Sequence, residues 1–179
     1  MKKLSITEMN RLSAEAFRQS GKIPLVVVLD NIRSLHNVGS VFRTCDAFRL
    51  EKIFLCGVTC IPPHPEIHKT ALGAEFSMEW SYTEDTLQTI ETLQKNGYTV
   101  FAVEQAHGSK LLNNVQLQST KKYALVFGNE VKGVQQIVLD RCDDCVEIPQ
   151  FGTKHSLNVS VAAGIVIWHF FKQLSVSLT

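Results

Sequence analysis

The chain has 179 residues, 45% of them hydrophobic and 20% charged, and its formal net charge is +1. These totals fit one globular domain and exclude a mostly disordered chain, because this much apolar side chain can offset the entropy of ordering the backbone. No stretch approaches the roughly 20 apolar residues that cross a bilayer. The start, Met1 to Leu4, resembles a signal peptide, but Thr7 and Glu8 interrupt any apolar core, so we expect a cytoplasmic protein.

The first predicted element is a helix over 6–20. Ser5 and Glu8 form the capping-box pattern that opens many helices. Residues 1–22 carry five basic side chains against two acidic ones. A basic arm on a nearly neutral body is compatible with a nucleic-acid partner, and a solvated helix face is the alternative. We therefore treat 1–22 as a basic helical extension and 23–179 as the main domain.

Strands and helices alternate through the main domain. The continuous apolar run from Leu25 to Leu29 predicts a central parallel strand that is covered on both faces. Further strands are predicted at 52–57, 77–82, 98–103, 123–127 and 145–148, and helices at 37–48, 66–72, 84–96, 134–141 and 157–174. This alternation indicates an α/β fold with a mostly parallel sheet flanked by helices.

The last predicted helix, 157–174, is apolar on every side between Val161 and Trp168. An amphipathic surface helix would show a polar face there. A single small sheet covers only one side of such a helix. We therefore expect a second subunit on the other side, which predicts a homodimer through this helix; a wholly internal helix is the alternative.

Five cysteines are an odd number for a disulfide framework, and the chain shows no export signal. Cys56 with Cys60 and Cys142 with Cys145 have spacings that zinc ligands can adopt. The carboxylates between the second pair oppose thiolate formation, so we expect no metal site.

Three segments carry polar residues that the fold alone does not require. The first runs from Asn37 through Arg43, after the polar end of the first strand at 30–31. Open α/β sheets bind ligands beyond the carboxyl ends of their strands. Asn37 would lie at the start of the following helix and Arg43 about two turns into it, while Gly39 permits a close backbone approach.

The second segment, 127–130, follows another strand. Gly128 lets the backbone approach a ligand, and Glu130 would be presented at the edge of the sheet. A simple strand-to-turn junction is the alternative.

The third segment, 148–158, joins a strand to the apolar helix and ends in Ser156 and Asn158. Helix caps are common at such positions. A cap explains one of these two side chains but not a long loop that ends in both.

The order and spacing of the three segments resemble the SpoU (TrmH) family of RNA 2′-O-ribose methyltransferases, within the SPOUT class. The family motifs are Asn-x-Gly followed by Arg-Thr, then Phe-Gly-x-Glu, then Ile-Pro-Met through Ser-Leu-Asn-Val-Ser. The matching residues are Asn37, Gly39, Arg43 and Thr44, then 127–130, then 148–160. The resemblance covers about 24–172, and Gln150 stands where the family usually has Met.

This resemblance implies a SPOUT fold for 23–179 whose C-terminal part is tied in a deep trefoil knot. It also implies S-adenosyl-L-methionine as the cofactor, held by backbone groups. By matching position, those groups belong to Val103, Gly128, Ile148, Ser156 and Leu157. The family dimerises through its last helix, which agrees with the expectation drawn from 161–168.

The implied reaction moves a methyl group from a sulfonium to a ribose 2′-hydroxyl. The residue that matches Arg43 has the leading catalytic role in the family. Because a free guanidinium has a pKa above ~12, we expect Arg43 to bind the adjacent phosphate and stabilise the developing alkoxide rather than act as the base. Glu130 would take the proton or hold Arg43, and Asn37, Ser156 and Asn158 would orient the ribose.

Compact members of the family often modify tRNA, so we expect a tRNA substrate. An rRNA 2′-O-methyltransferase is one alternative. A non-catalytic RNA-binding module that keeps the fold is the other, and the presence of Arg43, Glu130, Ser156 and Asn158 together speaks against it.

Overall fold

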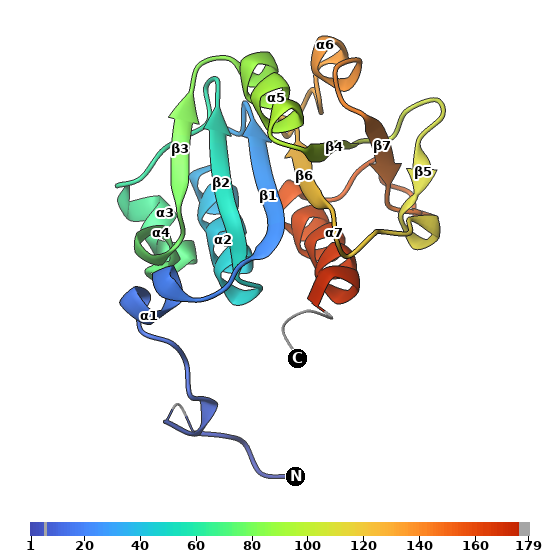
Figure 1. Cartoon of the computed structure of the whole chain (residues 1–179). Coiled ribbons are helices and arrows are strands. Elements are labelled where there is room, and N and C mark those ends of the chain that lie inside the picture. The colour runs from blue at the N-terminus through green and yellow to red at the C-terminus, as the bar shows by residue number, and fades with distance from the viewer. Residues whose placement is uncertain (6, 176–179) are drawn as a thin grey trace.

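A sheet of seven strands forms the centre of the computed structural model, which describes residues 1–5 and 7–175. Its order is β3-β2-β1-β6-β4-β7-β5, and every strand pairing in the described residues is parallel. The strands are β1 (Ile23–Asp30), β2 (Leu50–Cys56), β3 (Trp80–Thr83), β4 (Tyr98–Val103), β5 (Lys110–Leu111), β6 (Lys122–Phe127) and β7 (Asp144–Glu147). The predicted α/β fold with a mostly parallel sheet is confirmed (Figure 1).

Helices cover both faces of this sheet (Figure 1). They are the 3-10 turns η1 (Thr7–Met9) and η2 (Leu112–Asn114) and the helices α1 (Ala14–Gln19), α2 (Leu35–Ala47), α3 (Pro65–Ala71), α4 (Ala74–Ser77), α5 (Thr86–Lys95), α6 (Gln136–Leu139) and α7 (Val159–Leu174). Leu25 and Val27 of β1 share a core with α2 and α7, whereas Val26 and Val28 share one with α5 and α6. The apolar run is therefore buried on both faces, as expected for a central parallel strand.

The predicted helix over 6–20 is wrong in its first half, and residue 6 itself lies outside the described residues. Only η1 and the short α1 form there. Glu8 accepts the Ser5 N–H at 2.7 Å, but Asn10 adopts a left-handed backbone conformation (φ 47°), which ends a right-handed helix. Phe17 is the first buried side chain of the described arm, so no packing stabilises a longer helix before it.

Three smaller differences follow from tertiary contacts. Strand β3 begins three residues later than predicted, because α4 takes up the preceding segment and buries Ala74 and Ser77. Helix α6 is shorter than 134–141, since the Val134 N–H is held by a side chain after β4 instead of by a helical turn. The polar loop after β4 contains η2 and the two-residue strand β5, which no sequence pattern indicated.

Helix α7 buries one side only within the chain. Its buried residues are Ala163, Val166, Ile167, Phe170 and Leu174. On the opposite side Val161, Ile165 and Trp168 are exposed by 50%, 39% and 51%. We call these three residues the α7 stripe. No helix in the described part of the chain is long and apolar enough to span a membrane.

Gly39 lies where α2 and α3 meet. A Cβ atom at this position would collide with the backbone carbonyl oxygen of Ile67 and the hydroxyl of Thr70, both on α3. The Thr70 hydroxyl also donates to the carbonyl of His36 on α2 at 3.0 Å. The close approach that this glycine permits is therefore a contact between two helices rather than a contact with a ligand.

We predict that Gly39→Ala destabilises the fold, because the clash involves backbone and cannot be relieved by rotating one side chain. Overpacking of this kind costs about 1–3 kcal/mol. For a chain of this size the melting temperature should fall by about 2–4 °C per kcal/mol, measured by circular dichroism. Gly152→Ala is the control, since nothing lies within 4 Å of its Cβ position and its φ is not in the left-handed region. Equal melting temperatures for both variants would contradict the prediction.

Candidate functional site

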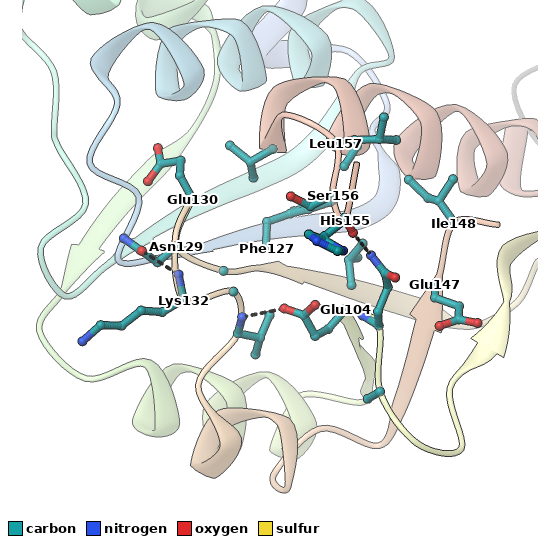
Figure 2. Close-up of a pocket in the computed structure, with 18 of the residues that line it drawn as sticks. Glu104, Phe127, Asn129, Glu130, Lys132, Glu147, Ile148, His155, Ser156 and Leu157 are labelled. Atoms are coloured by element: carbon teal, nitrogen blue, oxygen red, sulfur yellow. Dashed lines mark hydrogen bonds between the residues drawn. The ribbon is translucent and has the colours of Figure 1, made fainter. Parts of the chain in front are cut away.

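A cavity of about 1080 Å³ opens at the carboxyl ends of β4, β6 and β7. Its walls come from three loops that follow these strands and from the start of α7 (Figure 2). The lining residues fall within 103–107, 127–139, 147–150 and 155–162. Parallel strands place their carboxyl ends at one edge of a sheet, which is where ligands bind in open α/β folds.

All five residues predicted to hold a cofactor line this cavity. They are Val103, Gly128, Ile148, Ser156 and Leu157. A side chain at Gly128 would collide with the backbone of Gly133 and Val134, so only glycine allows these two stretches to approach. The structure thus brings together segments that lie up to 54 positions apart in the sequence.

Glu130 is bound to the start of α2. Its Oε1 accepts hydrogen bonds from the Ser34 N–H (2.9 Å) and from Asn37 Nδ2 (3.2 Å), and its Oε2 accepts one from the Arg33 N–H (3.2 Å). Desolvation raises the pKa of this carboxyl, but hydrogen bonds from the backbone of Ser34, of Glu130 itself and of Arg33 and from the Asn37 side chain outweigh it, so the net pKa is lowered. The positive end of the α2 dipole also favours a carboxylate here.

This geometry makes Glu130 a positioning group more than a proton acceptor, since a carboxylate with a lowered pKa and three donors is a weak base. Within the described residues of one chain, no hydrogen bond or ion pair joins it to Arg43, whose positioning was one of the two roles expected. Arg43 does lie two turns into α2, but it is exposed and lies outside the cavity lining. Within the described residues its guanidinium makes no hydrogen bond or ion pair.

The two polar residues before α7 have separate places. Asn158 is the N-cap, with Oδ1 accepting from the Ser160 N–H at 2.8 Å and from the Ser160 hydroxyl at 2.6 Å. Ser156 is exposed and faces the cavity (Figure 2). A cap thus explains Asn158 and leaves Ser156 available to a ligand.

The sequence reasoning missed Glu104, which follows β4 and lies in the middle of the cavity (Figure 2). Its two oxygens accept from the Gln105 N–H (2.9 Å) and from the Val134 N–H (2.9 Å), so it joins two walls. The Gln105 side chain then donates to the carbonyl of His155 at 2.6 Å. Glu104 lies directly after a buried strand, as Glu130 nearly does. This position in the sequence is the feature from which a place in the site could have been predicted.

The cavity suits an organic cation better than a metal ion. Its lining combines the carboxylates of Glu104, Glu130 and Glu147 with apolar side chains such as Ile148 and Leu157. No group of three or more His, Cys, Asp or Glu residues in the described chain is placed to hold a metal ion.

One of the two cysteine pairs considered for zinc is partly buried. Burial raises the pKa of Cys142 to about 12 and that of Cys145 to about 11. Both thiols are therefore protonated at neutral pH when no metal ion is bound. All five cysteines are free thiols in the described residues.

We predict that Glu130→Gln lowers stability only where the carboxylate is charged. Because the folded pKa is lowered, the stabilisation is complete above the ordinary pKa near 4.5 and is lost as the pH falls through the folded pKa. A carboxylate at a helix start contributes about 0.3–1 kcal/mol. The variant should therefore melt about 1–4 °C below the wild type at pH 7, with a difference that shrinks as the pH falls through the folded pKa.

The control is Glu79→Gln, which removes an exposed carboxylate that precedes strand β3 and lies away from any helix start. It should leave the melting temperature unchanged at both pH values. A Glu130→Gln deficit of the same size at pH 7 and at pH 3.5 would mean that charge is not what holds α2 in place.

Residues 24–168 match the model of the SpoU rRNA Methylase family. A Staphylococcus aureus (strain COL) relative, named "Putative TrmH family tRNA/rRNA methyltransferase", is 29% identical over 148 residues, which are 83% of this chain and 58% of the relative. The 23S rRNA (guanosine-2′-O-)-methyltransferase RlmB of Vibrio parahaemolyticus is 30% identical over 166 residues, 93% of this chain and 66% of that protein.

Solved structures of methyltransferases also resemble this chain. The AdoMet-bound rRNA methyltransferase of Sinorhizobium meliloti superposes with a TM-score of 0.80 at 28% identity, over 88% of this chain and 60% of that one. A structure described as "Structural insights into the 2-OH methylation of C/U34 on tRNA" gives 0.75 at 26% identity, over 84% of this chain and 96% of that one. The chain spans less than two thirds of the length of the curated relatives it matches. Because the family model covers most of the sequence, the chain belongs to the SpoU methylase family.

Proposed function

We propose that this protein is a methyltransferase that uses S-adenosylmethionine to methylate a ribose 2′-hydroxyl of RNA, with tRNA as the favoured substrate. The observation that carries the proposal is the large cavity, where all five predicted cofactor positions converge with carboxylates and apolar side chains. Two relatives with similar sequences bear on it: one structure contains AdoMet, and one relative is named as a 2′-O-methyltransferase.

The lining fits the cofactor chemically. Bound there, S-adenosylmethionine supplies an electrophilic methyl group on a positively charged sulfur. The carboxylates of Glu104 and Glu147 favour a cation in the cavity, and Ile148 and Leu157 offer apolar surface to a flat ring. Backbone groups of Val103, Gly128 and the stretch 156–157 would make the remaining hydrogen bonds. The knotted path of the C-terminal part stays a prediction from the family resemblance.

The residues of the chain would act by positioning and by electrostatics. Methyl transfer requires the ribose oxygen in line with the bond that breaks, so orientation supplies much of the rate. Ser156, exposed in the cavity, and Asn158 at the start of α7 would contact the ribose. Glu130 and Asn37 are bound to one another and would hold that geometry. Arg43 would bind the neighbouring phosphate and stabilise the alkoxide as its proton passes to solvent.

We infer that the protein acts as a homodimer through the α7 stripe. Trp168 of the stripe lies 5.5 Å from the ring of Phe48 and 5.7 Å from that of Phe171, so apolar surface continues across the end of α2. Helix α2 packs against α7. Because Arg43 is exposed on α2 and lies outside the cavity of its own chain, a second copy seated on this surface would allow it to serve the partner's cavity.

We predict a particle of twice the chain mass of 20.0 kDa in light scattering. Trp168→Glu places a charge in the stripe and should give the single-chain mass, because burying an unpaired charge is costly. Ile137→Glu, at an equally exposed apolar residue on α6, should leave the mass unchanged. A wild-type protein that is monomeric at 50 µM would overturn the dimer.

The choice of tRNA is supported by the solved structure described with methylation of tRNA, which is 26% identical over 84% of this chain. The basic extension 1–22, whose residues 1–5 and 7–12 reach away from the sheet in Figure 1, would add phosphate contacts. We also propose a cytoplasmic location, with which five free thiols are compatible.

The function is tested by titration calorimetry with S-adenosylmethionine and by mapping of 2′-O-methyl groups in RNA from cells with and without the gene. We expect binding, and the loss of a ribose methyl mark in tRNA. Arg43→Ala should lower methyl transfer at least about 100-fold, as removal of a charge-stabilising donor does, while cofactor affinity stays within about twofold. Arg141→Ala, an arginine paired with Glu91 on α5, is the matched control and should keep full activity.

Each contrary result has a distinct meaning. No cofactor binding would favour a non-catalytic RNA-binding module. A lost mark in rRNA would reassign the substrate, and a methylated base in nucleoside mass spectrometry would refute transfer to ribose. Equal losses of cofactor affinity and activity in Arg43→Ala would assign Arg43 to the cofactor instead of the RNA.

A further inference from the structure

A second, smaller cavity of about 340 Å³ adjoins the large one. It is lined by Asn31, Arg33, Val58, Asn129, Val131, Lys132 and Gln135. Asn129, Val131 and Lys132 belong to the lining of both cavities. The segment 129–132 is therefore a shared wall with one cavity on each side.

The two cavities have opposite charge. The large one is lined by three glutamates, as described above, together with Lys132 and two histidines. The small one has two cations, three carboxamides and two valines, and its described lining contains no carboxylate. The large cavity therefore favours a cation, and the small cavity favours an anion.

The two cations of the small cavity are not used by the fold. Arg33 and Lys132 are exposed, and within the described part of the chain neither side chain makes an ion pair or a hydrogen bond. Glu130 lies two positions before Lys132 in the sequence, but its carboxylate accepts hydrogen bonds from the start of α2 and does not pair with Lys132. Figure 2 shows Lys132 extending away from Glu104 and His155, hence away from the centre of the large cavity.

The frame of the small cavity is built by hydrogen bonds. Asn129 Nδ2 donates to the carbonyl of Asn31 at 2.7 Å, and its Oδ1 accepts from the N–H groups of Val131 (3.0 Å) and Lys132 (3.1 Å). Asn31 Oδ1 accepts from the Val58 N–H at 3.1 Å. These bonds fix the backbone from which Lys132 projects, so the site is formed before any ligand arrives.

We propose that the small cavity binds a phosphodiester group of the RNA substrate, with Arg33 and Lys132 as its cationic contacts. The inference rests on the proposed function, because the shared wall would let one strand reach the large cavity with its ribose and the small one with a neighbouring phosphate. Arg33 offers a planar pair of donors to a phosphate and Lys132 a point charge.

The test measures RNA binding as a function of salt concentration. The probe is a fluorescently labelled tRNA transcript, followed by anisotropy between 50 and 300 mM KCl without cofactor. A phosphate contact contributes about 0.7–0.9 to the slope of log affinity against log salt. Arg33→Ala and Lys132→Ala should each flatten the slope by about that amount and weaken binding roughly fivefold to tenfold at 100 mM. Arg33→Lys should restore most of the slope.

The matched control is Lys95→Ala, which removes one exposed cation at the end of α5, at the opposite edge of the sheet from both cavities. It should change neither the slope nor the affinity. An unchanged slope in Arg33→Ala, or an equal change in Lys95→Ala, would overturn the proposal. Weaker binding without a flatter slope would also overturn it, because a displaced loop loses affinity without losing a phosphate contact.

The test of the phosphate site can be distinguished from the test of the proposed function. Cofactor affinity of Arg33→Ala should equal that of the wild type in calorimetry, since Arg33 does not line the large cavity. The slope is also measured with an rRNA hairpin, because a phosphate contact does not depend on which RNA is methylated. Absence of methyl transfer would refute the proposed function alone, and an unchanged slope would refute the phosphate site alone.

Discussion

The hydrogen bonds of Glu130 to the start of α2 are the contacts on which the rest of the site depends. Strands β1 and β6 are neighbours, with Leu29 opposite Phe127, so the chains that leave them emerge side by side. Glu130 joins these two exits through Arg33, Ser34 and Asn37. A carboxylate at a helix start satisfies backbone donors that have no partner within the helix. This single side chain thereby fixes the first polar motif relative to the second.

The same connection between the segments that follow β1 and β6 explains why two cavities of opposite charge lie so close together. The turn after β6 is held by Asn129 and by Gly133, which takes a positive φ of 66° and has no room for a side chain beside Glu104. Glu104 then carries the connection on to β4. Glu104 and Glu147 thus lie on one side of the turn, while Lys132 projects from the other (Figure 2). A cationic cofactor would bind on one side of the segment 129–132, and the anionic RNA would bind on the other.

Sequence patterns predicted what depends on the backbone and missed what depends on side-chain partners. The parallel sheet followed from the apolar run at 25–29, whereas the positions expected for the cofactor came from the resemblance to the SpoU family. The helix over 6–20 failed because a capping pattern cannot form a helix without packing, and Phe17 is its first buried side chain. The hydrogen bonds that join Glu104 to Val134 and Glu130 to the start of α2 could not be predicted, because those partners lie 30 and 93 or more positions away.

The position of Arg43 links the proposed catalysis to the proposed dimer. In a single chain the large cavity has its carboxylates and its serine hydroxyl, but the guanidinium of the first motif lies outside. Helix α7, which packs against α2, exposes Val161, Ile165 and Trp168, and a monomer leaves these side chains in water. In the dimer proposed above, the second copy would cover this surface and would bring its Arg43 to the partner's cavity. A monomer would then bind the cofactor and remain inactive, so the proposal makes dimerisation a condition of the reaction.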